Sequence, residues 1–149
     1  RDGVINSERD DYTWQPADFV LNDGAGEALA RFQLSGFLLI VVTNQGGIDK
    51  GLYTKSDVEQ CHKKMRDELA KSNVVLDEIY YCSHHPDFSK CICRKPDSLF
   101  IEKAMARFNI DPKKSFFIGD RERDIQAAEK AGVRGILVKS NAPLNKIVF

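Results

Sequence analysis

The sequence predicts an α/β fold in which a parallel sheet is covered by helices on both faces. Short apolar runs alternate along the chain with segments whose apolar residues recur at helical spacing, which is the order expected of β-α-β-α units. The chain has 149 residues, the usual length of one domain, and it carries neither an internal repeat nor a low-complexity segment. We therefore expect residues 1–149 to form one core domain.

The first helix and the first strand are expected to follow each other closely. Apolar residues fall at helical spacing over residues 24–35, with Asp23 as a possible N-cap and Gly36 as the end of the helix. Residues 37–42 then form an unbroken apolar run, which is typical of parallel strands that are covered on both faces. This run is expected to be a central strand.

Two further helices are expected in the middle of the chain. Thr54 and Asp57 resemble a capping box, with Asp in place of the usual Glu. The apolar stripe of the helix that follows consists of Val58, Cys61, Met65 and Leu69. A third helix is expected from about Ser98 to Phe108.

The last part of the chain repeats the strand-helix-strand order. We expect strands at 115–118 and 135–138, and between them a short helix over 124–131 that Gly132 ends. Residues 81–96 do not fit this order, because they are rich in Cys, His and Pro. We expect them to be an insertion that is held by something other than a hydrophobic core.

Composition excludes several classes of function. The 22 basic and 22 acidic residues cancel, so no net field would hold the chain on nucleic acid, and no apolar run approaches the roughly 20 residues of a membrane helix. No signal peptide is recognisable, and three of the four cysteines fall within twelve residues, unlike a disulfide framework. We expect a cytoplasmic monomer without nucleic-acid or membrane partners.

The spacing of the cysteines predicts a zinc site in the insertion. Its potential ligands are Cys82, His84, Cys91 and Cys93. Three thiolates and an imidazole complete a tetrahedral Zn²⁺ shell without an open position, which is typical of a structural zinc ion. His85 is the alternative to His84, and a chance grouping is the alternative to a site. Cys61 lies on a helical stripe and is expected to be a small buried hydrophobe.

Three polar segments could carry chemistry. In the opening segment 1–6, an Asp is followed at once by a Gly that allows close approach of a ligand, although an ordinary turn is the alternative. Residues 43–47 and 119–124 each follow an expected strand, at the edge of the sheet where such folds bind ligands, although 43–47 could be a plain turn. Asp120 and Asp124 suit Mg²⁺, and a helix cap is their alternative role.

Together these segments resemble the haloacid dehalogenase (HAD) superfamily of phosphotransferases, and within it the zinc-containing histidinol and heptose bisphosphate phosphatases. Residues 1–6 match the motif DxDGxxN except for its first Asp. Thr43 matches the second motif, Lys95 the motif lysine, and Asp120 with Asp124 the acidic motif GDRxxD. The resemblance implies a three-layer Rossmann-like parallel sheet of the HAD type, with a zinc loop and without a large cap domain.

The resemblance also implies hydrolysis of a phosphate monoester through an aspartyl phosphate. Asp2 would be the general acid and base, and Thr43 and Lys95 would stabilise the transferring phosphoryl group. Mg²⁺ would be held by Asp2 and Asp120, with Asp124 in the outer shell.

The family places its nucleophilic Asp, and the strand that leads into it, directly before Arg1. We therefore expect the native chain to run upstream through a strand into this Asp. Without that residue, the chain would bind a phosphate ester and would not hydrolyse it by the mechanism of the family.

By resemblance, the substrate contacts would come from a flap over the site, formed in part by residues 8–12, and from the loops at the strand ends. They are Glu8, Tyr12, Thr43, Asn44, Gln45, Gly46, Arg94, Lys95 and Arg121. Arg94 and Arg121 suit the second phosphate of a bisphosphate, with ordinary surface charge as the alternative. The expected reaction removes the C7 phosphate of D-glycero-D-manno-heptose 1,7-bisphosphate. Histidinol phosphate is the alternative substrate, and a noncatalytic phosphosugar-binding module is the alternative class.

Overall fold

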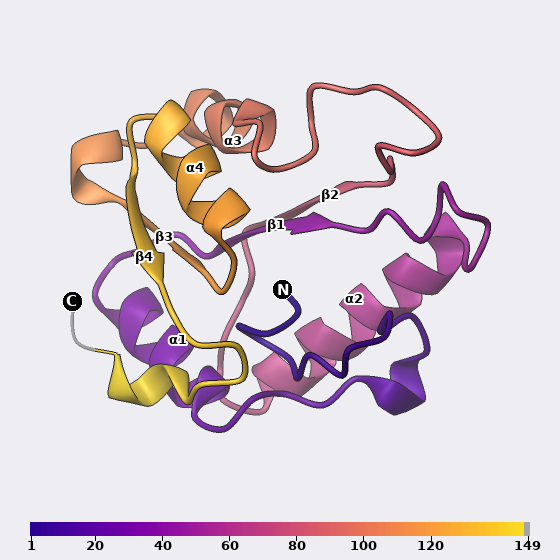
Figure 1. The fold of residues 1–149 in the computed structure, drawn as a ribbon. Coiled ribbons are helices and arrows are strands. Elements are labelled where there is room, and N and C mark those ends of the chain that lie inside the picture. Colours follow the sequence, from indigo (N-terminus) through magenta and orange to yellow (C-terminus); the bar gives the residue numbers. More distant parts are fainter. Residues whose placement is uncertain (148–149) are drawn as a thin grey trace.

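The computed structural model describes residues 1–147 and has the predicted α/β architecture with parallel strands. Its strands are β1 (Ile40–Asn44), β2 (Glu78–Cys82), β3 (Phe116–Gly119) and β4 (Arg134–Leu137). Its α-helices are α1 (Ala25–Leu34), α2 (Lys55–Ala70), α3 (Leu99–Phe108) and α4 (Glu122–Lys130), and its 3-10 helices are Pro16–Asp18, Pro112–Lys114 and Leu144–Lys146. α1 and α2 lie on one side of the strands and α3 and α4 on the other, so three layers result (Figure 1).

β1 is buried on both faces, which explains its apolar sequence. Val41 belongs to the cluster that contains Met65 and Leu69 of α2, whereas Val42 belongs to the cluster that contains Ile101 of α3. Because successive residues of a strand point to opposite faces, this one strand packs against both helical layers.

The helices agree with the predicted ones to within two residues at each end. Thr54 and Asp57 form the predicted capping box, in which the Asp57 N–H donates to Thr54 Oγ1 at 3.2 Å. The predicted N-cap of α1 is wrong, because Gly24 in the left-handed conformation takes the position expected for Asp23. No helix of residues 1–147 is both long and apolar enough to cross a membrane.

β1 begins three residues later than the apolar run 37–42. The Leu39 N–H donates to the carboxylate of Asp77, and the ladder with β2 starts only at Ile40. Phe37 and Leu38 consequently lie ahead of the strand and are partly exposed. Apolar character therefore extends beyond the backbone pairing that defines the strand.

β2 is not among the predicted strands. Its last two residues, Tyr81 and Cys82, lie inside the segment 81–96 that was expected to be an insertion, and the irregular loop begins at Ser83. The alternation that usually marks a strand is weak here, because the burial pattern along β2 is only partly alternating.

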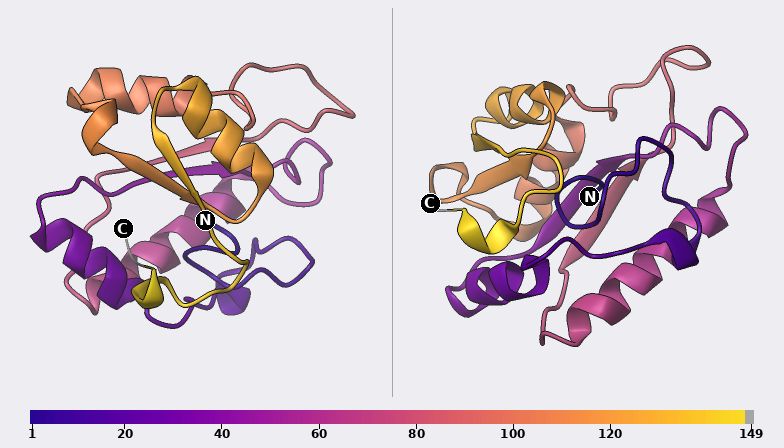
Figure 2. Two further views of the ribbon diagram at one scale, coloured as in Figure 1. Left: turned by 60° about the vertical axis from the view of Figure 1, so that its left-hand side comes forward. Right: turned by 60° about the horizontal axis from the view of Figure 1, so that its bottom comes forward.

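The described strands form two parallel sheets, β1 with β2 and β3 with β4, where a single sheet was expected. An apolar cleft of about 510 Å³ has residues of both sheets on its walls, among them Val41 of β1 and Ile118 of β3. Val4 and Ile5 of the N-terminal loop also line this cleft, and that loop lies between the two halves of the molecule (Figure 2). Within the described residues, β1 is thus at the edge of its sheet instead of the predicted central position.

Candidate active site and metal site

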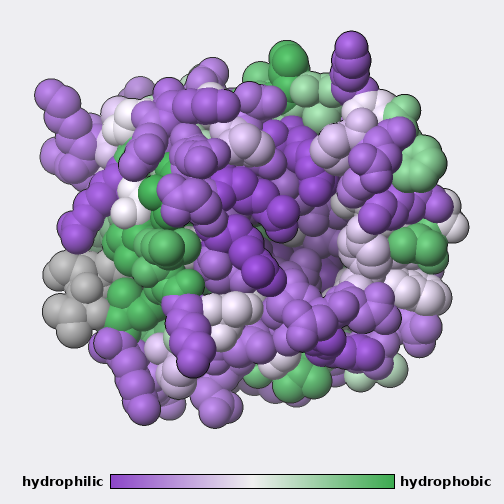
Figure 3. Space-filling model, in the orientation of Figure 1, coloured by the Kyte–Doolittle hydropathy of each residue, from purple (hydrophilic) through white to green (hydrophobic). Residues whose placement is uncertain are grey.

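The polar segments meet in one pocket of about 490 Å³ at the carboxyl ends of β1 and β3. It is lined by all the residues expected to act in catalysis, in substrate binding and as magnesium ligands: Asp2, Glu8, Tyr12, Thr43, Asn44, Gln45, Gly46, Arg94, Lys95, Asp120, Arg121 and Asp124. A hollow surrounded by hydrophilic residues opens on this face of the molecule (Figure 3). The structure therefore brings together residues as far apart in the sequence as Asp2 and Asp124.

Asp2 is held by its neighbours in the N-terminal loop. Arg1 Nη2 lies 2.9 Å from Asp2 Oδ1, and the Asn6 amide donates to the same oxygen at 2.9 Å. Burial raises the pKa of Asp2, but the positive charge of Arg1 and the hydrogen bond from Asn6 outweigh burial and hold this pKa below its usual range. The carboxylate is thus ionised and fixed in direction.

Gly3 allows Asp2 and Asp120 to approach each other. Its φ of +77° is in the left-handed region, and a Cβ at this position would lie 2.2 Å from Asp120 Oδ2. Any other residue would push the two acidic loops apart.

Asp120 carries an acceptor that the protein leaves free. Its Oδ2 is buried and has no hydrogen-bond partner among residues 1–147, although Arg121 Nε lies 3.4 Å away. An unsatisfied buried carboxylate oxygen is costly, and a hard cation would satisfy it. Asp2 and Asp120 are therefore suited to hold Mg²⁺.

Asp124 is already engaged through both of its carboxylate oxygens. Its Oδ1 lies 2.7 Å from Lys95 Nζ, and its Oδ2 accepts from the Arg121 N–H at 3.0 Å. Burial alone would raise the pKa of Asp124, but the positive charges nearby, chiefly that of Lys95, and the hydrogen bonds to the carboxylate together outweigh burial. The pKa of Asp124 therefore lies below its usual range. Because both oxygens are engaged, Asp124 is better suited to the outer shell of a cation than to direct coordination.

Lys95 is buried at the centre of the pocket wall. Its ammonium donates to the Val42 carbonyl at 2.9 Å and pairs with Asp124. The Asn44 side chain holds the backbone of Lys95 from both sides, since its amide donates to the Lys95 carbonyl at 3.1 Å and accepts from the Lys95 N–H at 3.0 Å. Burial lowers the pKa of Lys95, and Asp124 offsets part of this effect.

The flap and the two arginines form the outer part of the pocket. Glu8 Oε2 lies 4.0 Å from Arg121 Nη2, and the Glu8 backbone exchanges hydrogen bonds with the side chain of Asn141. Arg94 Nη1 donates to the His84 carbonyl at 3.0 Å. Both guanidinium groups thus face a pocket that is otherwise rich in carboxylates.

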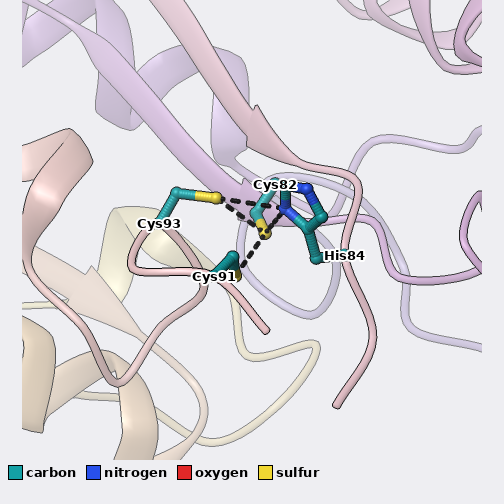
Figure 4. A group of neighbouring side chains, drawn as sticks. All are labelled: Cys82, His84, Cys91 and Cys93. Atoms are coloured by element: carbon teal, nitrogen blue, oxygen red, sulfur yellow. Dashed lines mark hydrogen bonds between the residues drawn. The ribbon is translucent and has the colours of Figure 1, made fainter. Parts of the chain in front are cut away.

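Cys82, His84, Cys91 and Cys93 converge on one point, as Figure 4 shows. Their ligand atoms all lie within 4.8 Å of one another, and the structure has these cysteines as free thiols. Cys82 Sγ lies 3.7 Å from Cys91 Sγ and 3.5 Å from His84 Nδ1. In a tetrahedral zinc shell, adjacent ligand atoms are separated by about 3.5 to 3.8 Å. These two distances match that range, whereas Cys93 Sγ lies 3.1 Å from Cys82 Sγ, so the cluster is close to such a shell.

The loop that carries the cluster is tied to the segment after β1 by Asp49, a residue that sequence reasoning missed. Asp49 Oδ2 accepts from the His85 N–H at 2.9 Å and from the Ser89 hydroxyl. These hydrogen bonds hold the pKa of Asp49 below its usual range. No motif marks Asp49, because its partners lie at least 36 residues further along the chain.

Tyr53 is a second residue that sequence reasoning missed. It is buried, its hydroxyl donates to Gln45, and its ring packs against Tyr12 of the flap and against the nearby Trp14. The only signal in the sequence is its position ten residues after Thr43, at the end of the same loop.

The chain is similar in sequence to known phosphatases. Residues 92–144 match the family described as HAD-hydrolase-like. The chain is 41% identical to the D-glycero-beta-D-manno-heptose-1,7-bisphosphate 7-phosphatase of Haemophilus ducreyi, over 90% of this chain and 76% of that protein. It is 39% identical to the D-glycero-alpha-D-manno-heptose-1,7-bisphosphate 7-phosphatase of Campylobacter jejuni, over 95% of this chain and 79% of that protein.

A solved structure gives the same result. The D,D-heptose 1,7-bisphosphate phosphatase of B. bronchiseptica, complexed with magnesium and phosphate, superimposes with a TM-score of 0.89. The sequence identity is 33%, and the match covers 98% of this chain and 80% of that one. The likeness thus extends over the whole α/β core and includes both strand-end loops.

Proposed function

Because the chain belongs to the HAD-like phosphatases, in the group of the heptose bisphosphate 7-phosphatases, we propose that it removes the C7 phosphate of D-glycero-D-manno-heptose 1,7-bisphosphate. The observation that carries this proposal is the pocket at the strand ends, where the motif residues and two arginines line one cavity. The relatives named for this reaction match most of the chain and supply the choice of sugar.

Asp2 is proposed to be the general acid and base. In the free protein Asp2 is ionised, but a phosphate dianion beside it disfavours the negative charge and raises its pKa, so that it binds a proton. Asp2 then gives this proton to the C7 oxygen as the phosphorus–oxygen bond breaks. It later takes a proton from the water that hydrolyses the aspartyl phosphate.

The attacking carboxylate is proposed to be an aspartate directly before Arg1, followed upstream by an apolar strand. The motif that ends at Asn6 requires this aspartate, and the apolar cleft between β1 and β3 has the lining that a buried strand needs. A strand in this cleft would pair with both sheets and join them into one.

Two residues are proposed to stabilise the phosphoryl group directly. Thr43 would donate its hydroxyl proton to a phosphoryl oxygen, and the ammonium of Lys95 would neutralise charge on the nucleophile and the phosphoryl group. Their burial strengthens both interactions, because water does not screen them.

Mg²⁺ is proposed to be held by the carboxylate of Asp120 and by the backbone carbonyl of Asp2, with Asp124 in the outer shell. The free buried oxygen of Asp120 supports this assignment. When bound, the ion supplies positive charge that offsets the repulsion between the attacking carboxylate and the phosphate.

The second phosphate is proposed to select the substrate. Arg94 and Arg121 would bind the C1 phosphate, while Glu8 and Tyr12 close the flap over the sugar and the strand-end loop at Gly46 contacts it. Histidinol phosphate has no second phosphate for the arginines, so they would contribute nothing to its binding.

A structural zinc ion is proposed to be bound by Cys82, His84, Cys91 and Cys93. The distances between the ligand atoms support it, and the closed shell leaves no position for a substrate. A cluster of cysteines that binds a metal, instead of forming disulfides, is more usual in reducing compartments, which supports a cytoplasmic location. We also infer a monomer, because one chain supplies all the residues proposed for the pocket.

The test compares specificity constants of the native protein for the heptose bisphosphate and for histidinol phosphate, with Mg²⁺ present. We expect kcat/KM for the bisphosphate to be at least about 100-fold higher, since two guanidinium contacts to a phosphate are each worth about 1.5 kcal/mol or more. Equal or better turnover of histidinol phosphate would overturn the sugar assignment. Binding of the bisphosphate without any turnover would favour a noncatalytic module instead.

A further inference from the structure

We propose that Tyr53 is a positioning residue, which acts through the Gln45 amide to fix the Asp2 carboxylate for proton transfer and to direct the Thr43 hydroxyl proton toward the phosphoryl group. This inference rests on the proposed function. It also changes the role of Gln45, whose side chain was expected to contact the substrate.

A continuous buried chain of hydrogen bonds links Tyr53 to Asp2. The Tyr53 hydroxyl donates to Gln45 Oε1 at 2.9 Å, and Gln45 Nε2 donates to Asp2 Oδ2 at 3.2 Å and to Thr43 Oγ1 at 3.0 Å. Gln45 is only 2% exposed. Both N–H groups of its amide are therefore used within the protein, and the side chain has no donor left for a substrate.

Tyr53 and Asp2 together determine which end of the amide faces Asp2. Burial raises the pKa of Tyr53, so the phenol keeps its proton, which it donates to Gln45 Oε1. If the amide were reversed, its oxygen would face the Asp2 carboxylate, which can only accept, and the buried Tyr53 proton would lose the acceptor at Oε1. The hydroxyl therefore reinforces the orientation in which the amide donates to Asp2.

The same amide orients Thr43. Because Thr43 Oγ1 accepts a hydrogen bond from Gln45, one of its lone pairs is occupied and its own proton remains available. Thr43 lines the pocket, so this proton is free to be donated to an oxygen of a bound phosphoryl group. Gln45 thus prepares a donor in the pocket in addition to holding the acid.

Tyr53 is itself held between the flap and the loop after β1. Its ring stacks on Trp14 with centroids 6.3 Å apart and meets the edge of Tyr12 at 5.5 Å. On the opposite side, a Cβ at Gly47 would lie 2.1 Å from Tyr53 Cε1, so only glycine leaves room for the ring. The position of the acid is therefore connected to the flap that covers the substrate.

Without the hydrogen bonds from Tyr53 through Gln45, the Asp2 carboxylate would be held at only one of its two oxygens. Its Oδ1 is fixed by Arg1 and Asn6, whereas the contact of Oδ2 within this network is the Gln45 amide. Without the amide, Oδ2 is no longer held, and the carboxylate can turn more easily about its Cβ–Cγ bond even though Arg1 and Asn6 still hold Oδ1. The expected defect is therefore in proton transfer to the leaving oxygen, and substrate binding should change little.

The first experiment replaces Tyr53 by Phe in the native protein and measures kcat/KM for two substrates. A sugar phosphate has an alkoxide leaving group that needs the proton of Asp2, whereas p-nitrophenyl phosphate has a leaving group that does not. We expect Tyr53→Phe to lower kcat/KM at least about tenfold for the heptose bisphosphate and less than about threefold for p-nitrophenyl phosphate, with KM nearly unchanged. Gln45→Glu, which places an acceptor opposite Asp2, should give a larger difference in the same direction.

The matched control is Tyr81→Phe. Tyr81 also loses a hydrogen-bonded hydroxyl, to Glu59 at 3.3 Å, but it lies outside the pocket, so both specificity constants should stay at the wild-type values. Equal losses for the two substrates in Tyr53→Phe would overturn the positioning of Asp2, because neither a structural defect nor a loss at Thr43, which contacts the phosphoryl group of both substrates, depends on the leaving group. Unchanged constants for both substrates would overturn it as well.

A second measurement does not depend on turnover. The side-chain amide protons of Gln45 should exchange slowly with solvent in NMR spectra of the wild-type protein, and faster in Tyr53→Phe. Rapid exchange in the wild-type protein would overturn the inference. If the wild-type protein hydrolyses neither substrate, the proposed function fails, and this measurement still decides whether the hydrogen-bond chain exists.

Discussion

Asp2 is the residue whose replacement should separate catalysis from binding. Asp2→Asn keeps the shape of the side chain and its place beside Arg1 and Asn6, but the amide cannot transfer the proton. We expect kcat for the heptose bisphosphate to fall by about 10² to 10⁴ while KM changes much less. Steady-state kinetics measure both values.

Asp67→Asn is the matched control for this replacement. Asp67 is an exposed carboxylate on α2 that pairs with Lys63. Its replacement should leave kcat within experimental error of the wild type. If Asp2→Asn retained wild-type turnover, Asp2 would not be the acid.

The buried imidazole of His62 predicts a loss of stability in mild acid. Burial lowers the pKa of His62 from 6.5 to about 3, and its Nε2 has no hydrogen-bond partner in the described part of the chain. The unfolded chain binds a proton at this imidazole below about pH 6.5, whereas the folded chain does not do so until about pH 3. The free energy of unfolding should therefore fall with decreasing pH across this window, by up to about 1.4 kcal/mol per pH unit.

Urea unfolding of the wild type and of His62→Phe between pH 7 and about pH 4 measures this slope. The variant should lose less stability per pH unit than the wild type. Gln60→His, which adds an exposed histidine to the same helix, should follow the wild-type slope. Parallel curves for the wild type and His62→Phe would contradict the assignment.

Sequence motifs predicted which side chains line the pocket, but not the partners of two amides. Asn44 and Gln45 were both expected to contact the substrate, and in the structure each amide is engaged by the protein. A motif specifies residue types and spacing along one segment, whereas the direction of an amide depends on partners from elsewhere. For Asn44 that partner is Lys95, which is 51 residues away.

At the scale of the elements, the capping box of α2 gives a prediction that is independent of function. Thr54→Ala removes the hydroxyl that accepts from the Asp57 N–H, and should lower the free energy of unfolding by about 1 kcal/mol. Ser56→Ala in the same exposed turn should change it by less than about 0.5 kcal/mol. Urea titrations at neutral pH measure both values, and equal effects would show that Thr54 does not cap the helix.

The zinc loop should lose its order when the metal is removed. We expect the native protein to bind about one Zn²⁺ per chain, and chelation should expose Lys90 in the loop to trypsin. Turnover measured after Mg²⁺ is restored should be lower as well, because Arg94 and Lys95 directly follow Cys93, a proposed zinc ligand.

Two cysteine variants make this test specific. Cys91→Ala should abolish stoichiometric zinc binding, whereas Cys61→Ala, which removes a buried thiol outside the cluster, should retain it. Metal analysis of the purified variants decides. Zinc binding that survives in Cys91→Ala would contradict the proposed ligand set.

Elements with local signals were predictable from the sequence, and those that depend on distant pairing were not. The capping box and the buried stripe located α2 closely. β1 was placed three residues too early and β2 was missed, because both are defined by hydrogen bonds to each other across 38 residues of chain. The strand propensity of one segment does not indicate which residues of another segment it pairs with.

At the scale of the whole molecule, the cleft between the two sheets is the feature that composition could not reveal. The order of the elements predicted one parallel sheet, and the described strands pair as two, with apolar side chains lining the space between them. The motif residues 2–6 and the apolar lining of this cleft both support the proposed upstream strand that ends in an aspartate. Because the net charge is zero, no overall field attracts an anion, and the proposed selection of the substrate depends on the local arginines.

The most direct test of the central claim follows the two phosphates of the substrate by ³¹P NMR. The native protein is incubated with Mg²⁺ and D-glycero-D-manno-heptose 1,7-bisphosphate, and the two ester resonances are recorded with time. The account predicts that the C7 phosphomonoester resonance disappears as inorganic phosphate forms, while the C1 resonance persists. Loss of the C1 phosphate, or release of no phosphate at all, would contradict it.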